Sequence, residues 1–349
     1  MTASPPLGSA RRETPETRAT VLTGPPAMVL RRMARFGPLR FVIGNAAVRI
    51  EQHGELCGVD PEGRLALVGD AELWLFPEHW HPDFLMTELA GAEGLLRLQF
   101  FHASGDEVLQ VVVDPHASSS SIPNLRAIIA RWRTSRPAPV PVRRAARRAD
   151  RASILAPGVE LALARARRTG GVRAVQEIVG RYGLSRIDAL SFLGDPWVYR
   201  VRCFAVTRLL EQIARRGLGV QLLIGNEGLT YVRQGPLPEP RCEGRNVVLR
   251  DANVSIEVRA AALDSLWAVR LRASGHEVSS LEAYDAEGSP AVLMFGTRDR
   301  AGGESPAWRA FVDRRRADGA GRDGVGIRDV STAPGPHARG GAQPSLQED

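Results

Sequence analysis

The tripeptide Ile43-Gly44-Asn45 returns in the second half of the chain as Ile224-Gly225-Asn226. The two copies lie 181 positions apart, and the same spacing separates Asp70 from Asp251 further along. Because this register holds over a long stretch, the chance recurrence of one tripeptide explains it poorly. The spacing is also far longer than the roughly 20–50 residues of a solenoid repeat. The sequence therefore predicts two copies of one domain.

The amino-acid composition separates the two predicted copies from a linker between them and from a tail at each end of the chain. The sequence has 349 residues, of which 44% are apolar, and this is enough for two cores of ordinary size. Glycine, proline, serine and charge dominate both ends, whereas arginine, proline and alanine dominate the middle, as in disordered tails and linkers. We predict a disordered tail over 1–26, a first repeat over 27–133, a linker over 134–170, a second repeat over 171–316 and a disordered tail over 317–349.

The two halves show the same order of periodic patterns. Apolar residues at helical spacing predict a helix over 27–36 and another over 204–216, each followed by a strand that ends in Gly-Asn. Because glycine and asparagine tolerate positive φ, we interpret Ile-Gly-Asn as a local hairpin turn. Alternating apolar residues predict strands over 73–76, 95–101, 108–113, 254–258, 265–271, 279–284 and 291–295. The predicted fold is α+β, with two tandem repeats that each have N-terminal helices and an antiparallel β-sheet.

Additional helices are predicted in front of the second copy. Helical spacing indicates one helix over 172–182 and another that begins at Ser185. Asp195-Pro196 follows, and because proline is favoured in the first turn of a helix, we predict a third helix from there.

The charge of the chain is carried in an unusual way. All 46 basic residues are arginine, so Schiff-base chemistry and a phosphate-loop lysine are both excluded. Arginines crowd the predicted linker, for example at Arg143-Arg144 and over 165–168. Such a linker could bind nucleic acid or an acidic partner. Since it lacks interleaved aromatic residues for base stacking, a solvated tether is favoured and nucleic acid is the weaker alternative.

The compartment is predicted from what the chain lacks. No stretch approaches the roughly 18 apolar residues of a membrane span, and no basic start with an apolar core marks a secretory signal. The three cysteines lie far apart without a CxxC motif, which fits a reducing compartment. We expect a cytoplasmic protein without membrane insertion.

A set of short motifs runs through both halves. They are Leu75-Phe76-Pro77 with Trp80, Leu98–Phe101, Leu184-Ser185-Arg186, Ile224–Gly228, Trp267–Arg270, Val278–Asp285, Phe295–Arg298 and Trp308-Arg309. These motifs resemble the bacterial haemin-degrading factor family of cytoplasmic haem-transport proteins, over residues 27–315 apart from the linker. The resemblance implies two stacked repeats that enclose haem in a cleft, a role in haem transport, trafficking or utilisation, a possible haem-degrading activity, and an inner-membrane haem importer as a partner.

The resemblance also implies positions for the haem site. Family members hold the iron between a histidine of the helix that opens the second half and an arginine of a first-half strand. Matching the motifs puts Arg173 at the histidine position and Trp74 at the arginine position. Neither change preserves ligation, because arginine stays protonated and the indole nitrogen is only a donor. Arg270 and Arg298 are the other cationic candidates for the cleft, and the Arg298 guanidinium could pair with a propionate.

A relocated iron ligand is the remaining question for the site. His79 and His81 flank Trp80 and form the densest group of ligand-type side chains in the chain. They point the same way if the segment is extended and diverge if it is helical. Either could bind the iron, although two solvated loop histidines are the favoured alternative.

Aromatic side chains at strand spacing are the candidates for lining a porphyrin cleft. They are Trp74, Phe100, Phe101 and Trp267, and ordinary sheet core is the favoured alternative for them. No catalytic residues are predicted. Three hypotheses remain: a haem-handling protein, an enzyme that opens the porphyrin ring, and a ligand-free interaction module that uses the arginine-rich linker.

Overall fold

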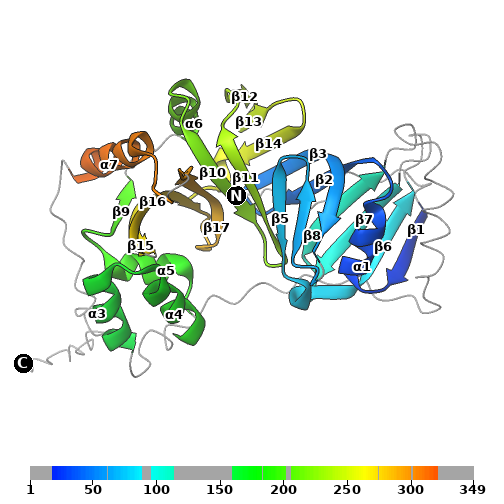
Figure 1. The fold of residues 1–349 in the computed structure, drawn as a ribbon, viewed down its shortest axis with the longest axis horizontal. Coiled ribbons are helices and arrows are strands. Elements are labelled where there is room, and N and C mark those ends of the chain that lie inside the picture. The colour runs from blue at the N-terminus through cyan, green and yellow to red at the C-terminus, as the bar shows by residue number, and fades with distance from the viewer. Residues whose placement is uncertain are drawn as a thin grey trace, which may run out of the picture.

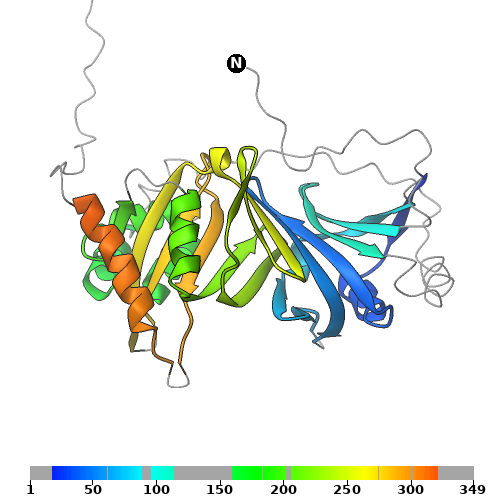
Figure 2. The same ribbon diagram turned by 90° about the horizontal axis from the view of Figure 1, so that it is seen from above.

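A computed structural model describes residues 18–60, 62–88, 96–113, 159–182, 184–201, 206–273, 275–299 and 302–320. Antiparallel strands make up most of this structure, and helices lie at its ends and along its faces (Figures 1 and 2). The predicted α+β class is therefore confirmed. Among the described helices, none is both long and apolar enough to cross a membrane.

The first half contains one helix and eight strands in the described residues. They are β1 (Arg18–Thr23), α1 (Pro26–Met33), β2 (Pro38–Gly44), β3 (Val48–Val59), β4 (Leu65–Val68), β5 (Ala71–Leu75), β6 (Trp80–Glu88), β7 (Leu96–His102) and β8 (Glu107–Val113). A short 3-10 helix, η1 (Pro77–His79), joins β5 to β6. The predicted first-half strands are all present, with boundaries that differ by one or two residues.

The second half begins with three additional helices. These helices are α3 (Val159–Thr169), α4 (Val172–Tyr182) and α5 (Arg186–Leu193). They are followed by β9 (Val198–Val201), α6 (Val206–Arg215), β10 (Gly219–Gly225), β11 (Leu229–Pro236), β12 (Arg241–Glu243), β13 (Asn246–Arg250), β14 (Val254–Arg259), η3 (Ala260–Ala262), β15 (Ser265–Ala273), β16 (His276–Tyr284), β17 (Pro290–Gly296) and α7 (Pro306–Ala320). The predicted helix over 172–182 is confirmed as α4.

Four expectations about the ends of these segments need correction. Residues 18–23 of the expected tail form β1, which pairs with β6. The expected linker ends in α3, whose Leu163 and Ala166 are buried against α4 and α5, so this helix is packed rather than solvated. The helix α7 extends past the expected boundary to Ala320. No helix starts at Asp195-Pro196, because Gly194 ends α5 at positive φ and β9 begins at Val198.

Each half contributes strands to the sheet of the other: β12, β13 and β14 of the second half join the first sheet, and β4 and β5 of the first half join the second. The first sheet runs β1-β6-β7-β8-β2-β3-β14-β13-β12, so that β14 of the second half pairs with β3. The second sheet runs β9-β15-β16-β17-β10-β11-β5-β4, so that β5 of the first half pairs with β11. The halves thus share their sheets, whereas the sequence predicted one sheet for each half.

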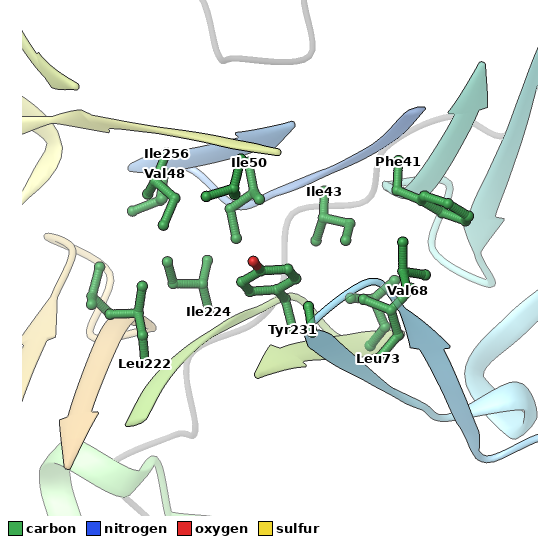
Figure 3. Close-up of a cluster of buried hydrophobic side chains, with 14 of the residues drawn as sticks. Phe41, Ile43, Val48, Ile50, Val68, Leu73, Leu222, Ile224, Tyr231 and Ile256 are labelled. Carbon is green, nitrogen blue, oxygen red and sulfur yellow. The ribbon is translucent and has the colours of Figure 1, made fainter. Parts of the chain in front are cut away.

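The main core lies where the two sheets face each other (Figure 3). Alternation along β2, β3 and β14 turns one set of side chains inward, and alternation along β5, β10 and β11 supplies the opposing set. The labelled members are Phe41, Ile43, Val48, Ile50 and Ile256 from the first sheet, and Val68, Leu73, Leu222, Ile224 and Tyr231 from the second. The space left beneath α6 is about 20 Å³ and has an apolar lining, so it holds nothing larger than a water molecule.

The repeated Ile-Gly-Asn turns join the two halves. The Asn45 side-chain amide donates to the carbonyl oxygens of Gly225 and Ala291, at 3.1 and 2.9 Å. The Asn226 amide donates in the same way to Gly44 and Val108, at 3.1 and 2.9 Å. Each asparagine Oδ1 also accepts two backbone N–H groups of its own turn. The predicted hairpins are confirmed, but the interpretation of Ile-Gly-Asn as a purely local turn is wrong.

The other pair of residues that recurs at a spacing of 181, Asp70 and Asp251, also lies where the two halves meet. Asp70 and Asp251 both form ion pairs with one side chain, the guanidinium of Arg233 on β11. The spacing of 181 residues therefore brings equivalent aspartates from the two halves to a common partner.

Replacement of Asn226 by alanine is expected to lower the free energy of unfolding by about 2 kcal/mol. The substitution removes the amide bonds to the other half and leaves four partly buried backbone groups without this partner. Urea unfolding followed by circular dichroism measures the change. The matched control is Asn253→Ala at an exposed position, which we expect to be close to neutral. Equal stability of the two variants would contradict the role of Asn226 at the junction.

Candidate functional site

The second sheet has one face in the core and one face turned outward. Trp74 and Glu72 point outward together on β5, since the indole Nε1–H donates to the Glu72 carboxylate at 2.8 Å. Residues directly opposite each other in antiparallel strands share a face. The register therefore places on Trp74's face Leu67 of β4, Val232 of β11, Leu223 of β10, and Leu293 and Phe295 of β17. We call these six residues the apolar strip.

The apolar strip is open at the end formed by β4 and β5. Leu67 and Trp74 are 42% and 40% exposed, and Leu223, Leu293 and Phe295 are half-buried. The helices α3, α4 and α5 pack at the other end of the same face, near β15 and β9 (Figure 1). There they bury Val269 and Leu271, which share the outward face. The apolar strip is therefore exposed at Leu67 and Trp74, buried at Val232 and half-buried on β10 and β17, and a helical layer lies beyond it.

An ion pair fastens the helical layer to the sheet beside the apolar strip. Glu282 lies opposite Leu293 in the pairing of β16 with β17, and its side chain is fully buried. It accepts bonds of 2.9 and 2.7 Å from the Arg186 guanidinium on α5, and bonds from the hydroxyls of Ser280 and Tyr284. Burial by itself would raise the pKa of Glu282, but the charge and hydrogen bonds of Arg186 outweigh it and hold that pKa below its usual value.

The start of α5 explains how Arg186 is positioned. The Ser185 hydroxyl accepts a bond from the Asp188 N–H at 3.1 Å and caps the helix, as the sequence predicted. Arg186 is the first residue after this cap. Its direction is therefore determined by local sequence, while its partner comes from a strand almost 100 positions away.

Trp74 and Arg173 lie on the same side of the sheet but not together. Trp74 is on β5, and the exposed Arg173 is on α4, which packs against β15. Five strand spacings separate β5 from β15, which corresponds to roughly 24 Å along the sheet. Of the two positions matched to iron-binding residues, Trp74 therefore belongs to the apolar strip, and Arg173 lies beyond the β17 end of the strip.

The other two cationic candidates lie elsewhere. Arg270 is on the face of β15 opposite to Val269, and its guanidinium forms an ion pair with Asp313 of α7. Arg298 is exposed between β17 and α7, where its backbone bridges to Glu304. Arg270 therefore faces away from the apolar strip, toward α7.

His79 and His81 have different surroundings. His79 is exposed at the end of η1, and its Nδ1 lies 2.8 Å from the carbonyl oxygen of Glu227. Its ring lies edge-on to that of His102, with centroids 5.9 Å apart. His81 is half-buried at the start of β6, and its Nδ1 accepts a 3.1 Å bond from the Asp83 N–H. Within the described residues, no group of three side chains of the metal-binding types could hold a metal ion.

The predicted aromatic lining is divided between core and surface. Phe100 is buried beside Phe84 and Trp80, with ring centroids 5.1 and 5.5 Å away, so its core alternative is confirmed. Trp267 is half-buried and shares the outward face with Trp74. The sequence analysis missed the other strip residues, although strands with apolar residues at consecutive positions, such as Leu222 and Leu223, indicate that both faces are covered.

A side chain can bind iron only through an atom that has a free lone pair, and neither Trp74 nor Arg173 has one. The Trp74 Nε1 carries a hydrogen and donates it to Glu72. The nitrogens of an arginine guanidinium such as that of Arg173 act only as hydrogen-bond donors. Neither side chain offers a lone pair, so the two matched positions do not fit iron ligation.

A family model described as the haemin-degrading HemS.ChuX domain matches residues 9–132 and 183–314. The hemin transport protein HemS of Yersinia enterocolitica is 22% identical over 305 residues, which are 84% of each chain. The hemin transport protein HmuS of Yersinia pestis is 22% identical over 292 residues, which are 82% of each chain.

Solved structures are similar over most of the chain. Holo-PhuS, a heme-binding protein from Pseudomonas aeruginosa, aligns with a TM-score of 0.71 and 22% identity, covering 84% of this chain and 86% of that one. ChuS, an E. coli heme oxygenase, aligns with a TM-score of 0.70 and 20% identity, covering 86% and 88%. At these identities the likeness establishes the fold.

Proposed function

Because the chain belongs to the haemin-degrading HemS.ChuX domain family, we propose that it binds haem or a related tetrapyrrole on the apolar strip. The observation that carries this proposal is the exposure of Trp74 and Leu67 on a sheet face whose other end is covered by helices. A porphyrin is flat and largely apolar, and tetrapyrrole and cofactor sites are lined mainly by apolar and aromatic side chains. Aromatic rings favour offset stacking on such a ligand.

The proposed cleft lies between the two structural repeats. In this proposal the two halves are copies of one unit, and Leu67 and Trp74 of the first copy stand on β4 and β5, which join a sheet built mainly by the second. The ligand would rest across β5, β11, β10 and β17. The helices α4 and α5 would border it.

Binding and transport are proposed here in preference to degradation. Opening the porphyrin ring requires iron held by a defined ligand within reach of oxygen. The side chains at the two matched positions, Trp74 and Arg173, supply no such ligand. We propose a cytoplasmic protein for haem transport, trafficking or utilisation that receives haem from an inner-membrane importer.

Family membership favours a tetrapyrrole over the alternative of an interaction module that uses the arginine-rich linker. The arginines at 143–151 lie outside the described residues. In α3, Arg167 Nε donates to the Phe192 carbonyl oxygen at 2.5 Å and its own carbonyl accepts from Trp197, so this arginine serves helix packing.

Hemin added to the full chain is expected to give a shifted and saturable Soret band. In the variant Trp74→Ala, hemin affinity should fall about tenfold, equivalent to ~1.4 kcal/mol, because the ring on which the porphyrin stacks is removed. The matched control is Met28→Ala on α1, which removes an apolar side chain of similar exposure, 45%, outside the apolar strip. Absence of any Soret shift in the unaltered protein would overturn the proposed function.

A further inference from the structure

The face that carries the apolar strip offers contacts to a flat ring, whereas its side chains offer no ligand to a metal. We propose that the strip binds a tetrapyrrole through the faces of its ring alone, so that an iron-free porphyrin binds as tightly as haem. This inference rests on the proposed function and deepens it by naming the ligand class: porphyrin macrocycles, with or without a bound metal.

The five strands beneath the proposed ligand keep their metal-binding residue types on the other face. Proteins ligate haem iron through histidine, cysteine, methionine or tyrosine. Within β4, β5, β11, β10 and β17, these types are represented by Tyr231 and Met294. Both are buried in the core, where the Tyr231 hydroxyl donates to Gln52 of the opposing sheet at 2.8 Å (Figure 3). Because side chains alternate along a strand, neither reaches the apolar strip.

The next strand, β16, adds one tyrosine and one histidine to the outward face. The Tyr284 hydroxyl donates to the Glu282 carboxylate. Burial and that carboxylate raise the pKa of Tyr284 well above its usual value, so the phenol stays neutral and is not a phenolate ligand. His276 begins β16, four residues before Ser280, which lies opposite Phe295 of the strip. This is roughly 13 Å along the strand, whereas an axial ligand must lie over the centre of the ring.

The helical layer beyond the strip also lacks suitable residue types. The helices α3, α4 and α5 contain no histidine, cysteine or methionine. Their one tyrosine, Tyr182, is the last residue of α4, nine positions after Arg173 and about 14 Å from it along the helix axis. The helices therefore supply no ligand near the matched position.

The two histidines predicted as relocated ligands lie away from the strip. The His79 ring contacts Phe76, His102 and the Glu227 carbonyl, at the junction of the two halves. His81 is near the start of β6, which belongs to the first sheet. In this inference neither histidine binds the iron.

What the strip supplies is a contact surface for a ring. The Trp74 indole donates to Glu72, the one charged side chain on the strip face of these five strands. This bond restrains the indole, and a surface that is fixed in advance loses little freedom on binding. Stacking on Trp74 and apolar contact with Leu67, Leu223 and Phe295 act on the macrocycle rather than on its metal. Their contribution is therefore the same for an iron-free ring and for haem.

The experiment titrates the full chain with three probes: hemin, iron-free protoporphyrin IX and zinc protoporphyrin. The Soret band measures each affinity, and for hemin it also reports the axial ligands. We expect the three dissociation constants to agree within about threefold, since ring stacking does not depend on the metal. In Trp74→Ala all three affinities should fall by the same factor, about tenfold. The hemin spectrum should be unchanged in a variant that combines His79→Ala, His81→Ala and His276→Ala.

The three probes separate failure of the inference from failure of the proposed function. If the affinities for hemin and protoporphyrin differ by about tenfold or more, or if the hemin spectrum changes in the triple histidine variant, the metal contributes to binding. The inference is then overturned while the proposed function stands. Unequal losses for the three probes in Trp74→Ala would overturn the inference too. If none of the probes binds the unaltered protein, the proposed function fails, and the inference fails with it.

Discussion

Replacement of Glu282 by glutamine is expected to lower the free energy of unfolding by about 3 kcal/mol, near the lower end of the loss when one partner of a buried ion pair is removed. The substitution keeps the shape of the side chain but removes the charge that offsets the Arg186 guanidinium. Arg186 retains some exposure, 26%, which limits the effect. Urea unfolding at neutral pH measures it.

The effect of this variant is expected to depend on pH. The pKa of Glu282 is lowered in the folded state, so the carboxylate stabilises the fold at pH values above the usual pKa of about 4.3. As the pH falls through and below that value, this stabilisation is lost. The difference in stability between the unaltered protein and Glu282→Gln should therefore shrink between pH 7 and pH 3.

The matched control for Glu282 is Glu177→Gln on α4. Glu177 pairs with Arg181 at the surface, where its side chain is 44% exposed, and such pairs contribute at most about 1 kcal/mol. Equal losses for the two glutamine variants would contradict the special role of the buried pair. A stability difference between the unaltered protein and Glu282→Gln that stayed constant from pH 7 to pH 3 would contradict the proposed pH dependence.

Replacement of Gly225 by valine is also expected to destabilise the protein by about 3 kcal/mol, through overpacking against backbone that cannot yield. A Cβ at this position would lie 2.5 Å from the Leu229 carbonyl oxygen, which accepts the turn hydrogen bond from Asn226. Moving the turn would also break the bond that the Asn45 amide makes to the Gly225 carbonyl. Thermal and urea unfolding both report the loss.

The control for Gly225 is Gly58→Val in β3. A Cβ at Gly58 would meet nothing within 4 Å, and the residue does not have positive φ, so we expect a change within about 0.5 kcal/mol. If both valine variants were equally stable, close packing at the repeated turn would not be the reason for its glycine.

The reason for that glycine is one point where sequence reasoning was wrong. We interpreted glycine in Ile-Gly-Asn through its tolerance of positive φ, yet neither Gly44 nor Gly225 has such a φ. In each copy a Cβ would collide with a carbonyl across the hairpin, at 2.6 Å for Gly44. The close approach arises from the turn hydrogen bond, and no periodicity in the sequence reports it.

Local patterns predicted most of the elements because their causes are local. The apolar spacing of residues 172–182 predicted α4, and Ser185 predicted the start of α5, since a helix and its cap depend on neighbours within four residues. The start predicted at Asp195-Pro196 failed because proline is also compatible with a turn. The strand β1 was missed because its six residues carry little alternation and their partner, β6, lies about 65 positions away.

The candidate site could be predicted only in part. The matched motifs proposed Trp74 as a site residue but did not indicate the other members of the apolar strip, which β4, β10, β11 and β17 supply. Arg270 was also predicted for the cleft, but the register of β15 with its neighbours places it on the opposite face of the sheet, toward α7. A shift of one residue moves every side chain to the opposite face, so the composition of a sheet face is a property of the pairing.

By itself the sequence determined that the protein is α+β. It also predicted that one arrangement of elements occurs twice, and that the side chains at the two positions matched to iron-binding residues, Trp74 and Arg173, offer no lone pair. These conclusions follow from spacing, local hydrogen bonding and side-chain chemistry. Only the tertiary structure decided that the halves exchange strands, that the two Ile-Gly-Asn turns hold each other, and that Tyr231 and Met294 face the core rather than the apolar strip. The physical reason is the same in each case: these properties depend on hydrogen bonds and strand pairings between distant segments, and a linear pattern does not specify which distant groups meet.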